Sequence, residues 1–432
     1  MAQDTSAFDA ALKDIYEGPI REQLNAKTRL LDIFTKEDMS QQKWEGRQVV
    51  RTLRKSRNAG VKATAESGLL PSAGRQGYVN QKIPMRFIEG RIELTTQVMK
   101  AARSDKGSFA RAMDTEQKGL VDDLARQRNR MLAGFGQGTL ALLNGAIGGG
   151  GATTMVVDAP GNVAGSVNGT RFIKAGMVLA FHDQAAPSTT IDAVRTVDSI
   201  TNSTTFELTA SAANLDDNAP ITLGVTIGGT NEGSYGIEPM GILGIVDSTT
   251  YVSNFQNIDR STAANAFFRS VIMASVGAIS SDILQRGIDN AEELSGEVID
   301  CFLCHPSVRR ELLKLTESDR RYAHSSSPSN DDAGTSAGAF KKDLTFNGIP
   351  VRVDKDLPYG TLIGVVKSHL SWYPEVEGEW ADEDGAVLAR VADKDNYEAR
   401  YRVFENFSSD RGNCHVRFDG VTATVTSGVY AD

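Results

Sequence analysis

Residues 106–135 read KGSFARAMDTEQKGLVDDLARQRNRMLAGF, and the spacing of their large apolar side chains decides what this segment forms. These side chains follow one another in steps of 4, 7, 4, 7 and 4 residues, at Phe109, Met113, Leu120, Leu124, Met131 and Phe135. One face of a helix produces that spacing, whereas a strand alternates every second residue. The average globular helix has about 11–12 residues, so this one is long. We expect a spine against which other elements pack; the alternative is an ordinary amphipathic core helix.

The totals describe a globular chain. Its 432 residues, 23% charged and 40% hydrophobic, leave room for about two or three domains. No run of apolar residues is long enough to span a bilayer, and the first residues lack the pattern of a signal peptide. Three cysteines (Cys301, Cys304 and Cys414) are too few for a disulfide framework, which predicts a reducing compartment. A net charge of −9 argues against general nucleic-acid binding.

The charge is unevenly distributed along the chain. Residues 47–91 carry ten basic side chains against only Glu66 and Glu89, so this segment has a net charge of +8 and the remainder −17. The basic residues are Arg47, Arg51, Arg54, Lys55, Arg57, Lys62, Arg75, Lys82, Arg86 and Arg91. Such a chain can attract its own copies, basic segment to acidic body.

The segments before the spine predict an arm and a long excursion. Apolar residues at helical spacing indicate two short helices, over 8–16 and 20–34, neither of which buries enough surface to be a domain. Residues 45–104 read as a long two-stranded excursion: RQVVRTLRKS, IPMRF and RIELTTQV suit strands, and a glycine-rich stretch separates the first two. A lone hairpin is marginal in water, so we expect it to pack on another subunit; the alternative is a disordered surface loop.

The texture changes after the spine. Glycine-rich joints at 145–151 and 227–236 bracket short strand candidates, which predicts a small barrel-like or sandwich-like domain; the alternative assigns these strands to the main sheet. Apolar spacing then predicts a helix over 261–288, a strand at EVIDCFLCH and a second helix beginning at Pro306. Residues 325–339 are polar and predict a mobile loop, and strand-like runs continue to the end of the chain.

The order of these segments carries a resemblance. The run from GLLPSAGRQGY (68–78) through IPMRFIEGRIELTTQVMKAA (83–102) into the spine resembles the major capsid proteins of tailed bacteriophages, which have the Hong Kong ninety-seven type fold. The resemblance implies an α+β fold with an N-terminal arm (1–44), an E-loop (45–104), a P-domain spine helix (105–151), an inserted small β domain (152–236), a P-domain connection (237–260), an A-domain (261–347) and return strands of the P-domain and A-domain (348–432).

The resemblance also implies a function. It predicts a shell subunit that self-assembles as hexamers and pentamers into an icosahedral head enclosing double-stranded DNA, assembled in the host cytoplasm and located in the virion. The implied partners are a portal protein, a separate scaffolding protein, a decoration or cementing protein, and packaged DNA contacted non-specifically. An encapsulin-like shell protein of a cellular compartment is the alternative.

Motifs for chemistry are weak, and we expect no catalysis, cofactor, metal or membrane. Cys301-Phe-Leu-Cys304-His305 has the spacing for covalent haem, but it lies in an apolar strand where cysteine commonly packs as a small hydrophobe. A redox protein using Cys301 and Cys304 is the enzyme-class alternative. No phosphate-binding loop, zinc-protease motif or nucleophile elbow occurs.

One acidic run has a functional interpretation. Residues 371–385 contain six carboxylates and no basic side chain, namely Glu375, Glu377, Glu379, Asp382, Glu383 and Asp384. A solvated acidic hairpin is one interpretation. The other is a dock for the basic E-loop of a neighbouring copy, so we predict inter-subunit contacts at these carboxylates and at Arg47, Arg51, Arg54, Lys55, Arg57, Lys62 and Arg75.

Overall fold

The computed structural model describes residues 30–37, 48–97, 106–227, 229–317, 344–382, 389–390 and 395–423. The chain divides into two compact units. Unit 1 comprises Met1–Arg29, Phe87–Asn129 and Glu375–Phe404, and unit 2 comprises Leu30–Arg86, Arg130–Pro374 and Glu405–Asp432. The predicted helix over 8–16, the predicted polar loop over 325–339, Arg47, Glu383 and Asp384 lie outside the described residues.

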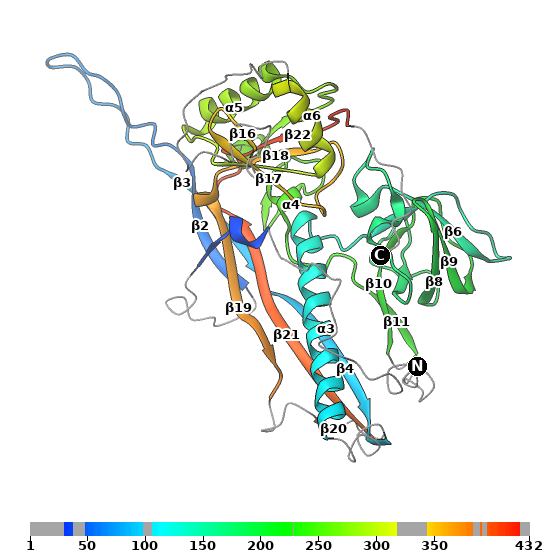
Figure 1. Cartoon of the computed structure of the whole chain (residues 1–432). Helices are drawn as coiled ribbons and strands as arrows, with labels where there is room; N and C mark the ends of the chain where they lie inside the picture. Colours follow the sequence, from blue (N-terminus) through cyan, green and yellow to red (C-terminus); the bar gives the residue numbers. More distant parts are fainter. Residues whose placement is uncertain are drawn as a thin grey trace, which may run out of the picture. The chain divides into compact units, whose positions relative to one another are not determined.

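The predicted spine is confirmed as helix α3, Lys106–Ala133, which is 28 residues long (Figure 1). Leu124 and Met131 of the apolar stripe are buried, as predicted. Leu120 of the same stripe packs on Gly90, where an added Cβ would lie 2.9 Å from Leu120 Cδ1. Gly90 therefore lets the backbone of the neighbouring strand approach the helix closely.

A long sheet contains that strand, in the order β1-β19-β21-β20, with β4 also paired to β21. The strands are β1 Thr35–Lys36, β4 Arg86–Thr95, β19 Leu370–Trp380, β20 Ala389–Arg390 and β21 Asn396–Ser409 (Figure 1). The sequence interpretation placed RIELTTQV within the excursion, but β4 covers its first half and pairs with β21 instead. Its partner lies some three hundred residues further along the chain, where no local pattern announces it.

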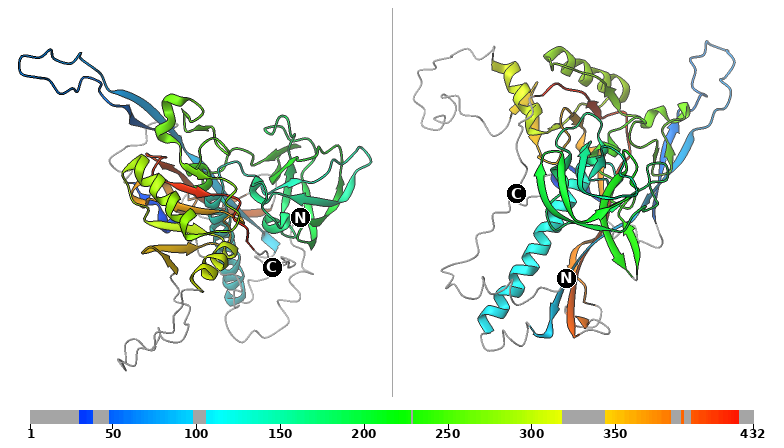
Figure 2. Two further views of the ribbon diagram at one scale, coloured as in Figure 1. Left: turned by 90° about the horizontal axis from the view of Figure 1, so that it is seen from above. Right: turned by 90° about the vertical axis from the view of Figure 1, so that its right-hand side faces the viewer.

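The basic excursion forms the antiparallel hairpin β2–β3, with β2 Gln48–Ser56 and β3 Gly77–Pro84. The register pairs Val49 with Ile83 and Leu53 with Val79, and a bulge follows Arg54. Residues 57–76 join the two strands and stand away from them in both views of Figure 2. We call residues 57–76 the hairpin tip, and the paired strands the hairpin root.

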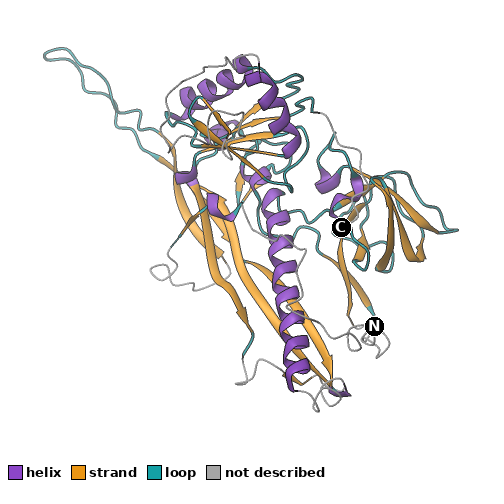
Figure 3. Ribbon diagram, viewed as in Figure 1, coloured by secondary structure: helices purple, strands orange, loops and turns teal. Residues whose placement is uncertain are grey.

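A six-stranded sheet in unit 2 has the order β14-β22-β18-β15-β17-β16. Its strands are β14 Val271–Met273, β15 Cys301–Cys304, β16 Leu344–Phe346, β17 Ile349–Val353, β18 Leu362–Val365 and β22 Val416–Phe418. Helices α5, Ser281–Ser295, and α6, Pro306–Glu317, lie beside this sheet (Figure 3). The predicted strand at 301–304 and the predicted helix start at Pro306 are confirmed.

The predicted helix over 261–288 is wrong. The structure has a 3-10 helix, η5 Ala263–Phe268, then strand β14, and α5 begins only after the capping hydroxyl of Ser280. Ser275 and Gly277 have positive φ values of 53° and 67°, which no α-helix contains. Val271 and its neighbours instead pair in parallel with β22. Val271 and its partner Val416 are β-branched, which suits a strand. The apolar spacing of 261–288 did not reveal this pairing, because it fits a helix as well.

A seven-stranded sheet, in the order β11-β10-β5-β6-β9-β8-β7, occupies residues 141–233 and curls so that β10 also pairs with β7. We call residues 141–233 the β-domain. Its strands are β5 Ala141–Leu143, β6 Ala152–Asp158, β7 Val178–Phe181, β8 Arg195–Asn202, β9 Thr205–Ala212, β10 Pro220–Ile227 and β11 Thr230–Gly233, with 3-10 helices η3 Pro160–Asn162 and η4 Gly169–Phe172. Because β5 precedes the glycine-rich joint predicted at 145–151, that joint lies inside the sheet.

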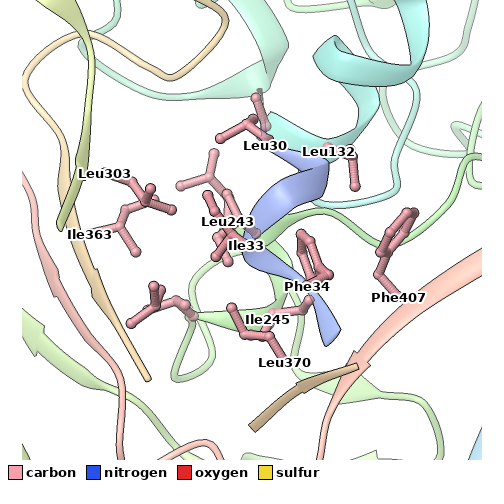
Figure 4. Close-up of a cluster of buried hydrophobic side chains, with 14 of the residues drawn as sticks. Leu30, Ile33, Phe34, Leu132, Leu243, Ile245, Leu303, Ile363, Leu370 and Phe407 are labelled. Carbon is pink, nitrogen blue, oxygen red and sulfur yellow. The ribbon is translucent and has the colours of Figure 1, made fainter. Parts of the chain in front are cut away.

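The main apolar core of unit 2 gathers residues from distant segments (Figure 4). Leu30, Ile33 and Phe34 from the start of the described chain pack there beside Leu132 and Phe407. The end of the second predicted arm helix, over 20–34, is not α-helical where the structure describes it. Residues 31–33 form the 3-10 helix η1, and Phe34 is extended, with its ring centre 4.8 Å from that of Phe407. The remaining short elements are α4 Ile242–Ile245, β12 Asn254–Phe255, β13 Ile258–Asp259 and η6 Lys367–His369.

Candidate assembly surface

The hairpin tip exposes apolar side chains that the rest of the fold would normally bury. Val61 is 86% exposed, Leu69 88% and Leu70 84%. Tyr78, at the start of β3, is 63% exposed. Leu69 and Leu70 are neighbours in the sequence, and large apolar side chains exposed together are typical of a binding surface.

Basic side chains surround those apolar residues. Arg54, Arg57, Lys62 and Arg75 are exposed, and Lys55 is half-buried. In the part of the chain that the structure describes, no ion pair joins these five cations to a carboxylate. The hairpin tip thus presents both apolar and positively charged groups outward.

Arg51 behaves differently from the other predicted contact residues. Its guanidinium donates to Ser371 Oγ (3.5 Å) and Tyr373 Oη (3.3 Å), and it pairs with Asp410 at 3.5 Å. Burial raises the pKa of Tyr373, and the charge of Arg51 partly offsets that rise. Arg51 therefore ties the hairpin root to its own unit.

A buried amide network fixes the other strand of the root. Gln81 is fully buried, and its Nε2 lies 3.0 Å from Gln256 Oε1, 2.9 Å from Ser408 Oγ and 3.0 Å from Ser409 O. The Lys82 amide donates to the Gln256 carbonyl at 2.9 Å. Buried polar groups that find several partners hold their element in one position, so the root is rigid where the tip is exposed.

Residues 371–380 of the acidic run belong to strand β19, and residues 383–385 lie outside the described residues, so the hairpin interpretation stays a prediction. Glu375, Glu377 and Glu379 are exposed on alternate positions of β19, with half-buried residues between them, and Asp382 is exposed just beyond. In the same unit, Arg402 pairs with Glu89 at 3.9 Å, and Arg91 pairs with Glu398 at 2.8 Å. The three glutamates therefore lie on the exposed face of β19. The two arginines Arg91 and Arg402 of the same unit pair with other carboxylates.

Sequence reasoning missed the exposed leucines and the burial of Arg130. Leu69 and Leu70 stand between Gly68 and Pro71 in a stretch without strand or helix periodicity, and that combination was the available signal. Arg130 is not part of the predicted apolar stripe, yet it is 8% exposed and pairs with buried Glu238. Burial raises the pKa of Glu238, and the charge of Arg130 opposes that rise.

The cysteines pack as predicted. Cys301 and Cys304 are both fully buried, but they lie on opposite faces of β15 and belong to different cores, one with Leu303 and the other with Phe302. Burial raises the pKa of the Cys304 thiol to about 12. The two thiols therefore do not form the dithiol that a redox centre would require.

No group of three or more His, Cys, Asp or Glu side chains among the described residues could hold a metal ion. None of their helices is long and apolar enough to cross a membrane.

Along the chain, the basic hairpin β2–β3 comes first, the spine helix α3 follows, and the helix-covered sheet comes later, while the long sheet joins strands from before and after the spine. The capsid of a native GTA particle has a similar structure, with 10% identity, coverage of 98% of this chain and 100% of that chain, and a TM-score of 0.50. The chain therefore has the Hong Kong ninety-seven type capsid fold that the sequence predicted.

Two further solved structures match with lower TM-scores. The capsid of cyanophage A-1(L) matches with 11% identity over 96% of this chain and 98% of that chain, with a TM-score of 0.49. An encapsulin complex from Synechococcus elongatus matches with 8% identity over the whole of both chains, with a TM-score of 0.45. No protein-family model and no curated protein matches the sequence.

Proposed function

We propose that this chain is the major capsid protein of a tailed bacteriophage, with a structural role and no catalysis. It assembles as hexamers and pentamers into the icosahedral shell around double-stranded DNA. One observation carries the proposal beyond the fold: the hairpin tip offers exposed leucines and unpaired cations, while its root is fixed in unit 2. A protein that works alone has no use for such an element.

Charge explains how the tip finds a second copy. The segment 47–91 carries +8 and the remainder of the chain −17, so the two attract each other between subunits. Each exposed pair contributes only about 0–1 kcal/mol. Every subunit of a closed shell repeats the contact, however, so the sum is large. We propose the outward glutamates of β19 as the dock, together with Asp382.

The same proposal names the partners. A portal protein, a separate scaffolding protein and a decoration or cementing protein complete the shell. The packaged DNA is contacted non-specifically, in keeping with a chain of net charge −9. Assembly takes place in the host cytoplasm, and the product is the virion.

A charge reversal at the end of β2 and the start of the hairpin tip tests the proposal. Arg54→Glu, Lys55→Glu and Arg57→Glu together should leave the subunit folded, because the three side chains lie outside the buried cores, and should abolish or misdirect shell formation. A matched control changes the charge by the same amount at the exposed lysines Lys118, Lys174 and Lys355, and it should still assemble. Sedimentation of assembled particles measures the result, with circular dichroism to confirm folding.

Salt and a compensating variant sharpen that test. Salt screens exposed pairs beyond about 10 Å at 0.1 M, so early association of the natural protein should weaken as salt rises. Changing Glu375, Glu377 and Glu379 to Lys in the charge-reversed chain should partly restore shells. Normal particle yield from the charge-reversed variant at both low and high salt would refute the charge argument. Particles purified from the source should contain DNA; a protein cargo would favour the encapsulin-like alternative.

A further inference from the structure

We infer that the β-domain is fixed on the six-stranded sheet by a latch formed by Asn168, Arg171 and Tyr359, so that the two move as one body. The glycine-rich segments around the β-domain predict a hinged appendage. The contacts within unit 2 predict the opposite. The latch lies inside one chain, so it can be tested in shells and in unassembled subunits alike.

Two hydrogen bonds cross from the β-domain to the loop between β17 and β18. Asn168 Nδ2 donates to Tyr359 Oη at 2.9 Å, and Arg171 Nη2 donates to the Leu357 carbonyl at 2.9 Å. Asn168 is 6% exposed and Tyr359 8% exposed. Hydrogen bonds shielded from water in this way are costly to break, because each leaves a buried polar group without its partner.

Ring contacts add to the hydrogen bonds. The Arg171 guanidinium lies 5.2 Å from the ring centre of Tyr359 and 4.9 Å from that of Phe172. The Tyr359 ring in turn lies 4.0 Å from the ring of His305. Burial lowers the pKa of His305 to about 3, with smaller contributions from Arg171 and Arg310, so this ring stays neutral in the contact near neutral pH. A neutral ring beside a guanidinium avoids repulsion between like charges.

Apolar packing closes the same interface. Val163 of the β-domain is 5% exposed and belongs to the main core of unit 2 with Leu243 and Leu357, not to the core of its own domain. Between Phe172, Pro358 and their neighbours only about 30 Å³ remains, the room of roughly one water molecule. The two surfaces are therefore in close contact around Phe172 and Pro358, whereas beside them an open cleft of about 480 Å³ lies between Val163 and Tyr359.

The latch sits at a special edge of the sheet. β15 and β17 run parallel, and His305 and the loop carrying Tyr359 follow their carboxyl ends. In open sheets this edge forms a crevice that commonly accepts a ligand. Here Arg171 and Tyr359 lie at that edge and contact each other.

The two connections of the β-domain are joined as well. The Gly236 amide donates to the Gln137 carbonyl at 2.7 Å, so the entering and leaving strands of chain are held side by side. Gly138, with φ of 84°, approaches Ser234 so closely that an added Cβ would lie 2.3 Å from its carbonyl oxygen. These glycines therefore permit a tight neck, and they do not act as hinges.

Hydrogen exchange of the full chain tests the latch. In Arg171→Ala, amides of residues 163–173 should exchange roughly tenfold to a hundredfold faster than in the natural protein, because the latch opens without global unfolding. Arg195→Ala is the matched control, since Arg195 bonds only within the β-domain, to Asp192 and the Ser211 carbonyl. It should accelerate exchange near those partners and leave residues 163–173 unchanged.

A milder variant keeps the test decisive if Arg171→Ala fails to fold. Tyr359→Phe removes only the hydroxyl that Asn168 contacts and retains the ring beside His305 and Arg171. It should accelerate exchange of residues 163–173 by a smaller factor, about fivefold. Unchanged exchange there in every folded latch variant would overturn the inference and leave the β-domain as a hinged appendage.

Discussion

The hairpin β2–β3 and the β-domain belong to the same unit, but the β-domain buries its large apolar side chains and the hairpin tip exposes them. The β-domain has its own core, in which Phe181 and Phe206 are fully buried, and a latch to the neighbouring sheet. The hairpin has a rigid root, but its tip leaves Leu69 and Leu70 in water. A short curled sheet can bury one face against itself, whereas a two-stranded ribbon cannot. The difference teaches that the β-domain is complete within the subunit and the hairpin tip is complete only in an assembly.

The largest expected effect comes from a cavity in the core of the β-domain. Phe206→Ala should lower the free energy of unfolding of the β-domain by about 3–5 kcal/mol, because the lost ring leaves a void in a packed core. Amide exchange in β9 measures the change. The counterpart is Leu70→Ala at the hairpin tip, which should change stability by at most about 0.5 kcal/mol. Similar losses in both variants would break the comparison.

The next largest effect should come from acid, which should weaken the six-stranded sheet and the β-domain. Burial lowers the pKa of His305 and of His415 to about 3, and it lowers that of His182, whereas an unfolded histidine titrates near 6.5. The fold therefore favours the neutral rings. Their stabilisation is present above about pH 6.5 and is lost as pH falls toward 3, by roughly a few kcal/mol in total. The hairpin, residues 48–84, contains no histidine.

Geometry supports that sign and offers a variant. His415 Nδ1 accepts the Val366 amide at 3.3 Å, and His305 Nδ1 accepts the Ser307 amide at 3.1 Å, so protonating either nitrogen removes an acceptor. His305→Asn keeps an acceptor at the start of α6 and cannot titrate. Denaturation between pH 7 and 4 should show a shallower acid loss in this variant. An unchanged slope would remove His305 from the account. Glu238, whose pKa burial raises, acts in the opposite direction and offsets part of the loss.

A smaller effect should mark the boundary between root and tip. Gln81→Ala should destabilise unit 2 by about 1–3 kcal/mol, because the buried acceptors at Gln256 and Ser408 lose their donor. Thr52→Ala is the control: Thr52 donates to Asn80 at an exposed position, so its loss should cost less than about 0.5 kcal/mol. Chemical denaturation compares the two. Equal effects would mean that the buried amide network fixes the root no better than an exposed hydrogen bond does.

Local periodicity predicted the elements whose partners lie close in sequence or whose pattern is long. The stripe from Leu120 to Met131 gave helix α3, and Pro306 marked the start of α6. The errors came from distant partners. Strand β14 pairs with β22 near the end of the chain, and Arg130 is buried because Glu238 lies beside it. The sequence next to β14 or Arg130 contains no pattern that indicates either of these distant partners.

The candidate surface divides in the same way. Charge counting along 47–91 located the hairpin and its cations, because a run of like charges is a local property. It could not tell that Arg51 turns inward to Asp410 while Arg54 stays exposed, since that depends on which strand face the fold covers. The Asn168–Tyr359 contact was equally invisible, because Asn168 belongs to the β-domain and Tyr359 to the distant loop between β17 and β18.

The smallest effect on stability should accompany a large effect on assembly. Leu69→Ser with Leu70→Ser should leave the free energy of unfolding within about 0.5 kcal/mol, because both side chains are already in water in the free subunit. Shell yield should nevertheless fall sharply, since a partner that covers the two leucines gains roughly 1.5–3 kcal/mol for each, repeated at every subunit. Sedimentation at high salt separates this contribution from charge. Salt weakens the attraction of Arg54 and Arg57 for carboxylates, but it does not restore the apolar contact that serine cannot make. If the double variant assembles normally at both salt concentrations, the exposed leucines serve no contact, and charge alone must account for the hairpin tip.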